Sequence, residues 1–183
     1  MMYKLFFAVV IVVSLHTVLC AKRPFNLELY NVRCNRTAEV VKTCECKIHK
    51  LSTNRYSSNA WFELNRQLNS NAQIAMMLYY NLAKSSRIVK FIDVKMNTCD
   101  IMASLQRVPL LRNILTEIRR NSNFPLECPI KGNVMYNLTN MIVTNEIVPP
   151  YASTINFNVS IDFYEHQQQI ATYRLSGATV PKS

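Results

Sequence analysis

Glycine is nearly absent from this 183-residue chain, which contains only Gly132 and Gly177. A loop that cradles nucleotide phosphates needs several glycines at fixed spacings, because its backbone must approach the ligand closely. Two isolated glycines cannot form such a loop. The sequence therefore excludes nucleotide-binding proteins of that kind.

Catalytic groups are scarce as well. Beyond the N-terminal apolar stretch the only histidines are His49 and His166, and neither a GxSxG nor an HExxH motif is present. Two histidines in a basic protein could serve acid–base catalysis, as in a ribonuclease. However, His166 lies in a polar, turn-like stretch and His49 follows a predicted strand. We expect no enzyme activity, no metal site and no cofactor.

Acidic residues are few, with 11 Asp and Glu against 21 Lys and Arg, and the formal net charge is +10. Such a surplus attracts anionic membranes, glycans or nucleic acid. The basic residues are scattered, and the longest runs are the pairs Lys22-Arg23 and Arg119-Arg120. No basic stripe with interleaved aromatic residues is present, so we expect a solvated cationic surface and no nucleic-acid partner.

The only long apolar run lies near the N-terminus, where Lys4 precedes Leu5–Val13. A charged start, a short apolar core and small residues near Cys20 are the order of a secretory signal peptide. A membrane span needs about 20 apolar residues, which this run does not reach. The sequence predicts a signal peptide over residues 1–20 and a secreted, extracellular single domain over residues 21–183, with an uncleaved anchor as the alternative.

Five cysteines remain after that cleavage. In an oxidising compartment they should pair, with one left over. Cys44 and Cys46 lie two residues apart on a predicted strand, so they face the same side and cannot bridge each other. We expect one disulfide from Cys34 to either Cys44 or Cys46, and a second from Cys99 to Cys128.

Three N-x-S/T sequons begin at Asn35, Asn137 and Asn158. In a secreted protein each is a candidate glycosylation site and must then face solvent. On the strand that contains Asn158, the residues that alternate with Asn158, at the odd-numbered positions, are therefore expected to face inward.

Short segments of alternating polarity run through the chain, and the clearest extends from Ser153 to Tyr164. A period of two is typical of a strand with one buried and one solvated face. Polar Ser/Asn stretches separate the segments as turns do. Eight strands at this spacing predict an antiparallel β-sandwich or barrel. The other seven cover Phe25–Tyr30, Val40–Ile48, Asn59–Gln67, Ala72–Asn81, Ile88–Met96, Val134–Val143 and Gln169–Leu175.

One segment has a different period. From Cys99 to Arg120 the apolar residues recur at separations of three and four, which predicts an amphipathic helix. Pro109 divides it and begins its second half, because proline suits a first helical turn. Cys99 and Cys128 bracket this helix, so their disulfide would hold it against the sheet.

Two motifs carry a family resemblance: the C-[DK]-[FIL] helix start at Cys99 and the box CP-x-x-G-x-x-x-Y-x-L from Cys128 to Leu138. With them the chain resembles an insect family of small secreted proteins of unknown function, grouped with the ML lipid-recognition superfamily, near the chemosensory B-type proteins of flies. The resemblance covers roughly Asn26–Ala178. The sequence departs from the family at Cys46, where an apolar residue is usual.

The resemblance implies an immunoglobulin-like, ML-like β-sandwich with a helix inserted at about residues 99–120 and an apolar ligand between the sheets. It also places Cys44 at the family's second cysteine, which gives Cys34, Cys44, Cys99 and Cys128 as the disulfide residues. Eight methionines suit an adaptable interior, although a closed core is the alternative. The candidate ligand-binding residues are Met76, Leu78, Phe91, Met96, Phe157 and Phe163.

We expect a secreted, non-enzymatic binding protein for a lipid or other hydrophobic ligand, acting in chemosensation of a pheromone or contact cue, with a membrane receptor as a further partner. The alternative is a secreted cationic protein that binds anionic membrane or glycan surfaces in immunity or reproduction. The first predicts accessible apolar space between the sheets. The second predicts binding that weakens steeply with salt.

Overall fold

The structure is a computed structural model that describes residues 23–83, 85–104, 116, 118–125, 128–150 and 152–182. The signal peptide predicted over residues 1–20 lies outside the described residues, and so does the stretch 105–115 of the predicted helix. None of the helices in the described part of the chain has the length and apolar character that a membrane span requires.

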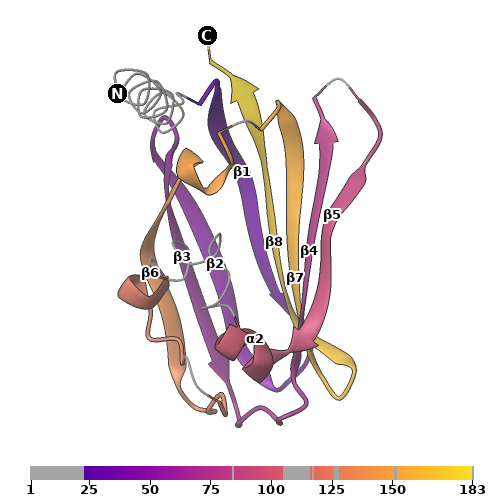
Figure 1. The fold of residues 1–183 in the computed structure, drawn as a ribbon. Coiled ribbons are helices and arrows are strands. Elements are labelled where there is room, and N and C mark those ends of the chain that lie inside the picture. Colours follow the sequence, from indigo (N-terminus) through magenta and orange to yellow (C-terminus); the bar gives the residue numbers. More distant parts are fainter. Residues whose placement is uncertain are drawn as a thin grey trace, which may run out of the picture.

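The fold is mainly β, with two antiparallel sheets that face each other (Figure 1). Each of the eight strands predicted from alternating polarity overlaps an observed strand, which confirms the prediction of an antiparallel sandwich. The strands are β1 (Phe25–Arg36), β2 (Val41–Ser52), β3 (Arg55–Leu64), β4 (Gln73–Leu82), β5 (Val89–Asn97), β6 (Met135–Thr144), β7 (Ile155–Glu165) and β8 (Gln168–Pro181). Helical segments include α2 (Thr98–Ser104) and the 3-10 helix η2 (Asn145–Ile147).

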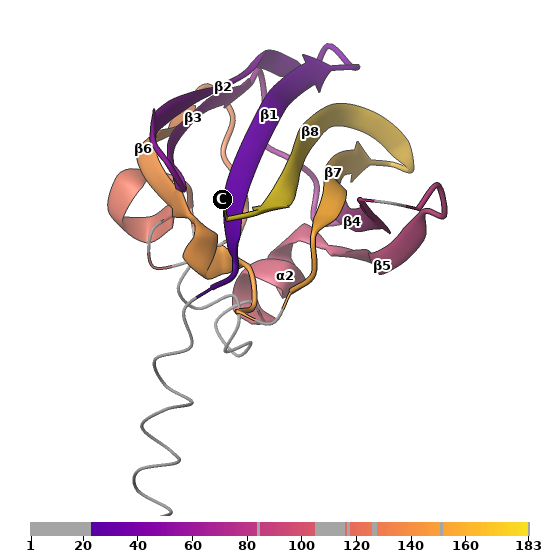
Figure 2. The same cartoon turned by 90° about the horizontal axis from the view of Figure 1, so that it is seen from above.

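The larger sheet has the strand order β1-β8-β7-β4-β5, and the smaller sheet has the order β2-β3-β6. Seen from above, the strands follow an arc whose two ends are β6 and β5 (Figure 2). The chain passes from one sheet to the other between β1 and β2, where the Cys34–Cys46 disulfide links the two sheets. The sandwich is therefore closed along β1 and β2, and β5 stands at the opposite, open side.

The core consists of two separate clusters of buried residues. An upper cluster contains Leu27, Leu29, Tyr56 and Phe157. A lower cluster, at the α2 end of the sandwich, contains Val40, Val41, Leu64, Leu68, Ala72, Ile170 and Ala171. Apolar burial stabilises a fold by roughly 25 cal/mol per Å², so the two ends of the sandwich hold the sheets together.

A bulge at Tyr30 changes which residues of β1 face inward. The register of β1 against β8 shifts between Leu29 and Asn31. Leu27 and Leu29 face inward before the bulge, whereas Cys34 does so after it. This change of parity brings Cys34 to Cys46 of β2, with their Cα atoms 5.6 Å apart.

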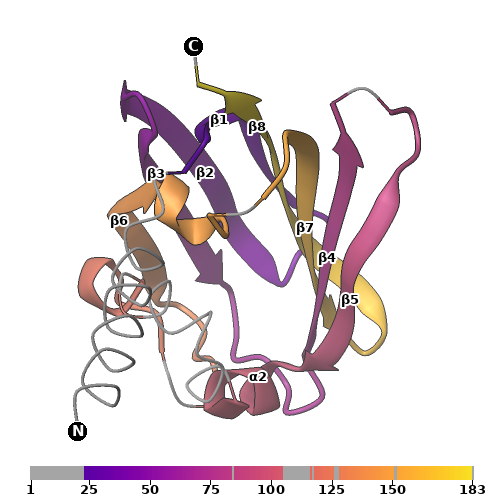
Figure 3. The same cartoon turned by 45° about the horizontal axis from the view of Figure 1, so that its top comes forward.

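The predicted helix is confirmed at its start by α2, which lies at the lower end of the sandwich (Figure 3). The side-chain oxygen of Asn97 caps it by accepting a hydrogen bond from the backbone N–H of Cys99 at 2.8 Å. Residues 118–121 are helical too. The Cys99–Cys128 disulfide is present and ties α2 to the segment that precedes β6.

Candidate ligand-binding site

Pairing across the larger sheet arranges its inward-facing side chains in rows. From the upper to the lower end these are Leu29, Gly177, Phe157, Tyr80 and Val89; then Val32, Leu175, Val159, Leu78 and Ile92; then Cys34, Tyr173, Ile161, Met76 and Val94; and then Ala171, Phe163, Ile74 and Met96. The second and third rows are called the middle layer below.

The middle layer differs from both ends of the sandwich in its burial. None of its ten residues is fully buried, and Val94 is 43% exposed. On the central strand β7 the order of burial is inverted: Ile161 faces inward but is partly exposed, whereas the outward-facing Asp162 is only 4% exposed. A closed core would bury the apolar residues first. Apolar surface therefore remains accessible between the two core clusters.

On β3, the central strand of the opposite sheet, the inward side chains change in size along the strand. Phe62 of β3 stacks on Phe163 at the lower end, with ring centroids 6.1 Å apart, and Tyr56 packs in the upper cluster with Phe157. Between Tyr56 and Phe62 the inward positions of β3 carry Ser58 and Ala60. Along β3 the inward side chains are thus large at both ends and small in between. In the same rows of the smaller sheet, Ile48 and Met141 flank Ser58, and Cys46 and Leu138 flank Ala60.

The structure brings together most of the predicted ligand-binding residues, with one correction. Met76 and Leu78 lie in the middle layer, while Phe157, Phe163 and Met96 lie in the rows that flank it.

Phe91 was predicted to face inward, and this prediction is wrong. It sits where the register of β5 against β4 shifts, between Ile92, which pairs with Leu78, and Lys90, which pairs with Tyr79. This bulge leaves Phe91 69% exposed, with its ring edge against Tyr80. Ile92 and Val94 occupy the inward positions of β5 instead.

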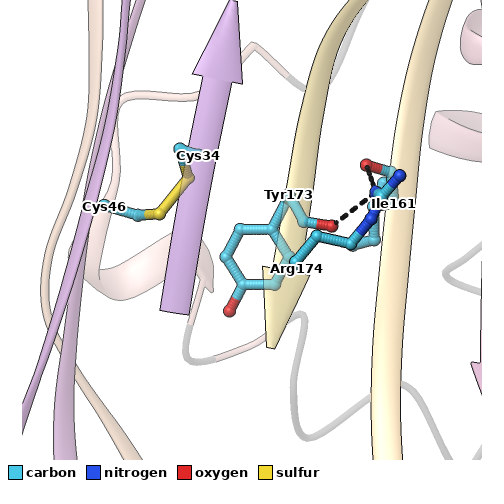
Figure 4. Close-up of a disulfide and its surroundings, with 5 residues drawn as sticks. All are labelled: Cys34, Cys46, Ile161, Tyr173 and Arg174. Carbon is cyan, nitrogen blue, oxygen red and sulfur yellow. Dashed lines mark hydrogen bonds between the residues drawn. A yellow bond between two sulfur atoms is a disulfide. The ribbon is translucent and has the colours of Figure 1, made fainter. Parts of the chain in front are cut away.

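Tyr173 is a polar member of the middle layer that sequence reasoning missed. Its ring extends from β8 on the side that carries the Cys34–Cys46 disulfide, whereas the neighbouring Arg174 donates to the backbone oxygen atoms of Ile161 and Tyr173 (Figure 4). Burial raises the pKa of the Tyr173 phenol to about 12. The sequence signal that could have identified Tyr173 as an inward-facing residue is its alternation with Ala171 and Leu175 in the predicted strand.

The disulfide of β1 also corrects a prediction. Cys34 pairs with Cys46 and not with Cys44, which is the free cysteine among the described residues. Cys44 packs against the lower cluster, and burial raises the pKa of its thiol to about 11. Both cysteines face inward, as their spacing predicts, but only Cys46 reaches Cys34.

Raising the pH from 9 to 12 is expected to lower the free energy of unfolding progressively. Cys44 and Tyr173 hold their protons more tightly in the folded protein than in the unfolded chain, where their pKa values are about 8.5 and 10. Stability is therefore fully present below about pH 8.5 and is lost as the pH rises through the folded pKa values. Urea unfolding across this range measures the slope, which should flatten in the double variant Cys44→Ala/Tyr173→Phe; an unchanged slope would contradict this origin.

A polar network occupies the lower end of the sandwich. The carboxylate of Glu165, whose side chain is 3% exposed, accepts hydrogen bonds from Arg66 Nη1 and Nη2 at 2.9 and 2.6 Å and from the backbone N–H of Asn69 at 2.9 Å. Pairing with Arg66 lowers the pKa of this carboxyl. The His166 ring lies 2.8 Å from the Asn69 amide. Arg66 lines two open pockets of about 630 and 740 Å³ here.

The three sequon asparagines avoid the interior. Asn158 and Asn35 are exposed, and Asn137 pairs with Trp61 on the face of the smaller sheet that points away from the middle layer. Within the described residues, no three His, Cys, Asp or Glu side chains lie close enough together to hold a metal ion.

Comparison with known proteins finds a family model that matches part of the chain. No curated protein matches the sequence. A crystal structure of a protein from Archaeoglobus fulgidus aligns over 78% of this chain and 98% of its own, at 8% sequence identity and a TM-score of 0.26. The family described as "Protein of unknown function (DUF1091)" matches residues 72–159, so a DUF1091 domain extends from the start of β4 to the middle of β7.

Proposed function

We propose that this protein is a secreted, non-enzymatic carrier that binds a lipid or other hydrophobic small molecule in the middle layer. The observation that carries the proposal is the accessible apolar surface of that layer, whose ten inward-facing residues are only partly buried although they lie between two buried core clusters. A bound alkyl chain would gain about 0.8 kcal/mol for each CH₂ group that it buries there. Two disulfides agree with an oxidising, extracellular compartment.

The family match agrees with this proposal. DUF1091 is known to be ML-like, and the resemblance of this sequence to the ML superfamily implies an immunoglobulin-like sandwich with an apolar ligand between its sheets. The chemosensory B-type proteins of flies, which the sequence also resembles, act in chemosensation. We therefore propose a chemosensory role, in which the carried molecule is a pheromone or contact cue presented to a membrane receptor.

The substitution Ala60→Phe tests the proposal, because a phenyl ring at that position would fill the space opposite the middle layer. Displacement of an environment-sensitive naphthylamine probe by dodecanoic acid, checked by native mass spectrometry, measures binding. We expect wild type to bind and Ala60→Phe to bind at least tenfold more weakly. The melting temperature of the variant is measured alongside, because a larger inward side chain can overpack the fold, and the comparison of binding requires a folded variant.

Ala83→Phe is the matched control, since Ala83 is exposed in the turn after β4. It should bind as wild type does. Wild-type protein that binds no apolar probe, or Ala60→Phe protein that binds as well as wild type, would overturn the proposal.

A second candidate is recognition of anionic membranes or glycans in immunity or reproduction. It is favoured by the edge strand β5, where the ammonium groups of Lys90 and Lys95 lie over the rings of Tyr79 and Tyr164 at 5.9 and 4.2 Å. Co-sedimentation with anionic phospholipid vesicles would measure it. Binding must fall steeply between 50 and about 500 mM salt, as screening requires; salt-independent sedimentation would argue against it.

A further inference from the structure

The hydroxyl group of Tyr173 has no hydrogen-bond partner among the described residues. This hydroxyl is accessible to solvent, because the described residues contain no unpaired side-chain oxygen or nitrogen that is closed off from it, and Tyr173 itself is only partly buried. The fully buried tyrosines Tyr56 and Tyr136 do find partners, as buried tyrosines normally do. The Tyr56 hydroxyl donates to the carbonyl oxygen of Leu27 at 3.4 Å, and the Tyr136 hydroxyl donates to the Lys131 carbonyl at 3.2 Å while accepting from its N–H at 3.1 Å. Tyr173 therefore carries a polar group that the fold itself does not use.

The surroundings of Tyr173 are apolar. Its neighbours in the third row are Cys34, which is in a disulfide, and Ile161. Burial is the cause of its raised pKa, as expected for a phenol that neither pairs with a charge nor accepts a hydrogen bond. At neutral pH the group is protonated, so it offers an O–H donor inside an otherwise apolar layer.

We propose that the Tyr173 hydroxyl donates a hydrogen bond to an oxygen atom of the carried molecule, which is therefore an oxygenated hydrophobic compound rather than a pure hydrocarbon. This inference rests on the proposed function and adds the chemical class of the ligand. A ligand without an acceptor would cover the accessible hydroxyl and leave it without a partner, and a polar group that is buried unpaired costs free energy.

The third row also gives the ligand a direction. From Tyr173 it continues over Ile161 and Met76 to Val94 on the edge strand β5. Three strand spacings of about 4.8 Å give a path of roughly 14 Å. The oxygen lies at the closed side beside the disulfide, and the apolar chain extends towards the open side at β5.

The test uses two probes of the same shape: 2-tridecanone, which has a carbonyl oxygen, and 2-methyl-1-tridecene, in which a CH₂ group replaces that oxygen. Both displace the naphthylamine probe from wild type and from Tyr173→Phe. We expect Tyr173→Phe to bind the ketone about fivefold more weakly, as loss of one hydrogen bond predicts, and to bind the alkene as tightly as wild type does.

Tyr79→Phe is the control, because the Tyr79 hydroxyl bonds to the Met77 sulfur on the outer face of the sheet. It should change neither affinity. Equal affinities of wild type and Tyr173→Phe for the ketone, an equal loss for both probes, or an equal loss in Tyr79→Phe would overturn the role of Tyr173 while leaving the carrier function in place. Wild-type protein that binds neither probe would overturn both.

Discussion

Replacing Gly132 by alanine is expected to lower the melting temperature by roughly 6–12 °C. A Cβ atom at this position would overlap the backbone carbon atoms of Arg66 and lie 2.7 Å from its nitrogen. Backbone cannot move aside as a flexible side chain does, so the overpacking should cost about 3 kcal/mol, and each kcal/mol shifts the melting temperature of a domain of this size by about 2–4 °C.

The backbone at Gly132 lies close to the backbone at Arg66, and two backbone hydrogen bonds connect the two segments on either side of this contact. The N–H of Leu68 donates to the carbonyl of Ile130 at 3.0 Å, and the N–H of Asn133 donates to the carbonyl of Leu64 at 2.7 Å. Leu64 and Leu68 belong to the lower cluster. A methyl group at Gly132 would therefore strain the lower end of the sandwich as a whole.

Lys131→Ala is the control for this prediction, since the adjacent Lys131 is exposed and surface changes usually stay within about 0.5 kcal/mol. Differential scanning calorimetry of the two variants beside wild type measures the difference. If Gly132→Ala melted with wild type, the two backbone segments could not lie as close as described.

The strands were predictable because their signal is local. Alternation of apolar and polar residues reports one buried face, and the segment from Ser153 to Tyr164 shows it without a break. In the observed β7 (Ile155–Glu165) the apolar residues of this alternation face inward, and Phe157 belongs to the upper cluster. The helix start at Cys99 was predictable for the same reason, from its period of three and four.

Bulges limit such predictions, because one extra residue exchanges the two faces of a strand. Phe91 has the polarity of an interior residue, but it sits at the register shift of β5 and is exposed. The bulge at Tyr30 likewise resets the inward positions of β1. No short-range pattern in the sequence marks either position.

Which residues form the middle layer depends on how strands that are distant in the sequence pair and face one another. Ala60 and Ser58 are unremarkable in the predicted sequence pattern, and they matter because they are the inward residues of β3 between Tyr56 and Phe62. Those two aromatic residues pack with Phe157 and Phe163, which stand at either end of the middle layer on β7. Tyr173 lay within a predicted strand, but its role follows only from its neighbours across the sheet. The existence of an apolar interior was therefore predictable, whereas its accessible part was not.

Removing the bridge between the sheets should have the second large effect. Cys34→Ala and Cys46→Ala are each expected to lower the free energy of unfolding by about 3 kcal/mol, the chain-entropy value for a loop of this length. The double variant should cost no more than either single variant, because both substitutions remove the same bond. Urea unfolding under non-reducing conditions measures all three.

Cys44→Ala is the matched control on the same face of β2, and it separates the two pairings that the sequence left open. Cys44 is free and packs against the lower cluster, so its truncation should cost only about 1 kcal/mol of packing. A loss of about 3 kcal/mol for Cys44→Ala, together with a near-neutral Cys46→Ala, would show that Cys34 pairs with Cys44 instead.

The same bridge should influence ligand binding, because Cys34 belongs to the third row beside Tyr173. Without the disulfide, the spacing of the sheets along β1 and β2 depends on packing, on the chain connection and on the hydrogen bonds of Asn54 and Tyr56 to Leu27. These lie towards the upper end of the sandwich, so the Tyr173 hydroxyl should be held less firmly relative to the ligand. We expect Cys34→Ala to weaken binding of 2-tridecanone more than binding of 2-methyl-1-tridecene, whereas Cys44→Ala should leave their ratio unchanged. A ratio that stays at the wild-type value in Cys34→Ala would show that the bridge contributes stability alone.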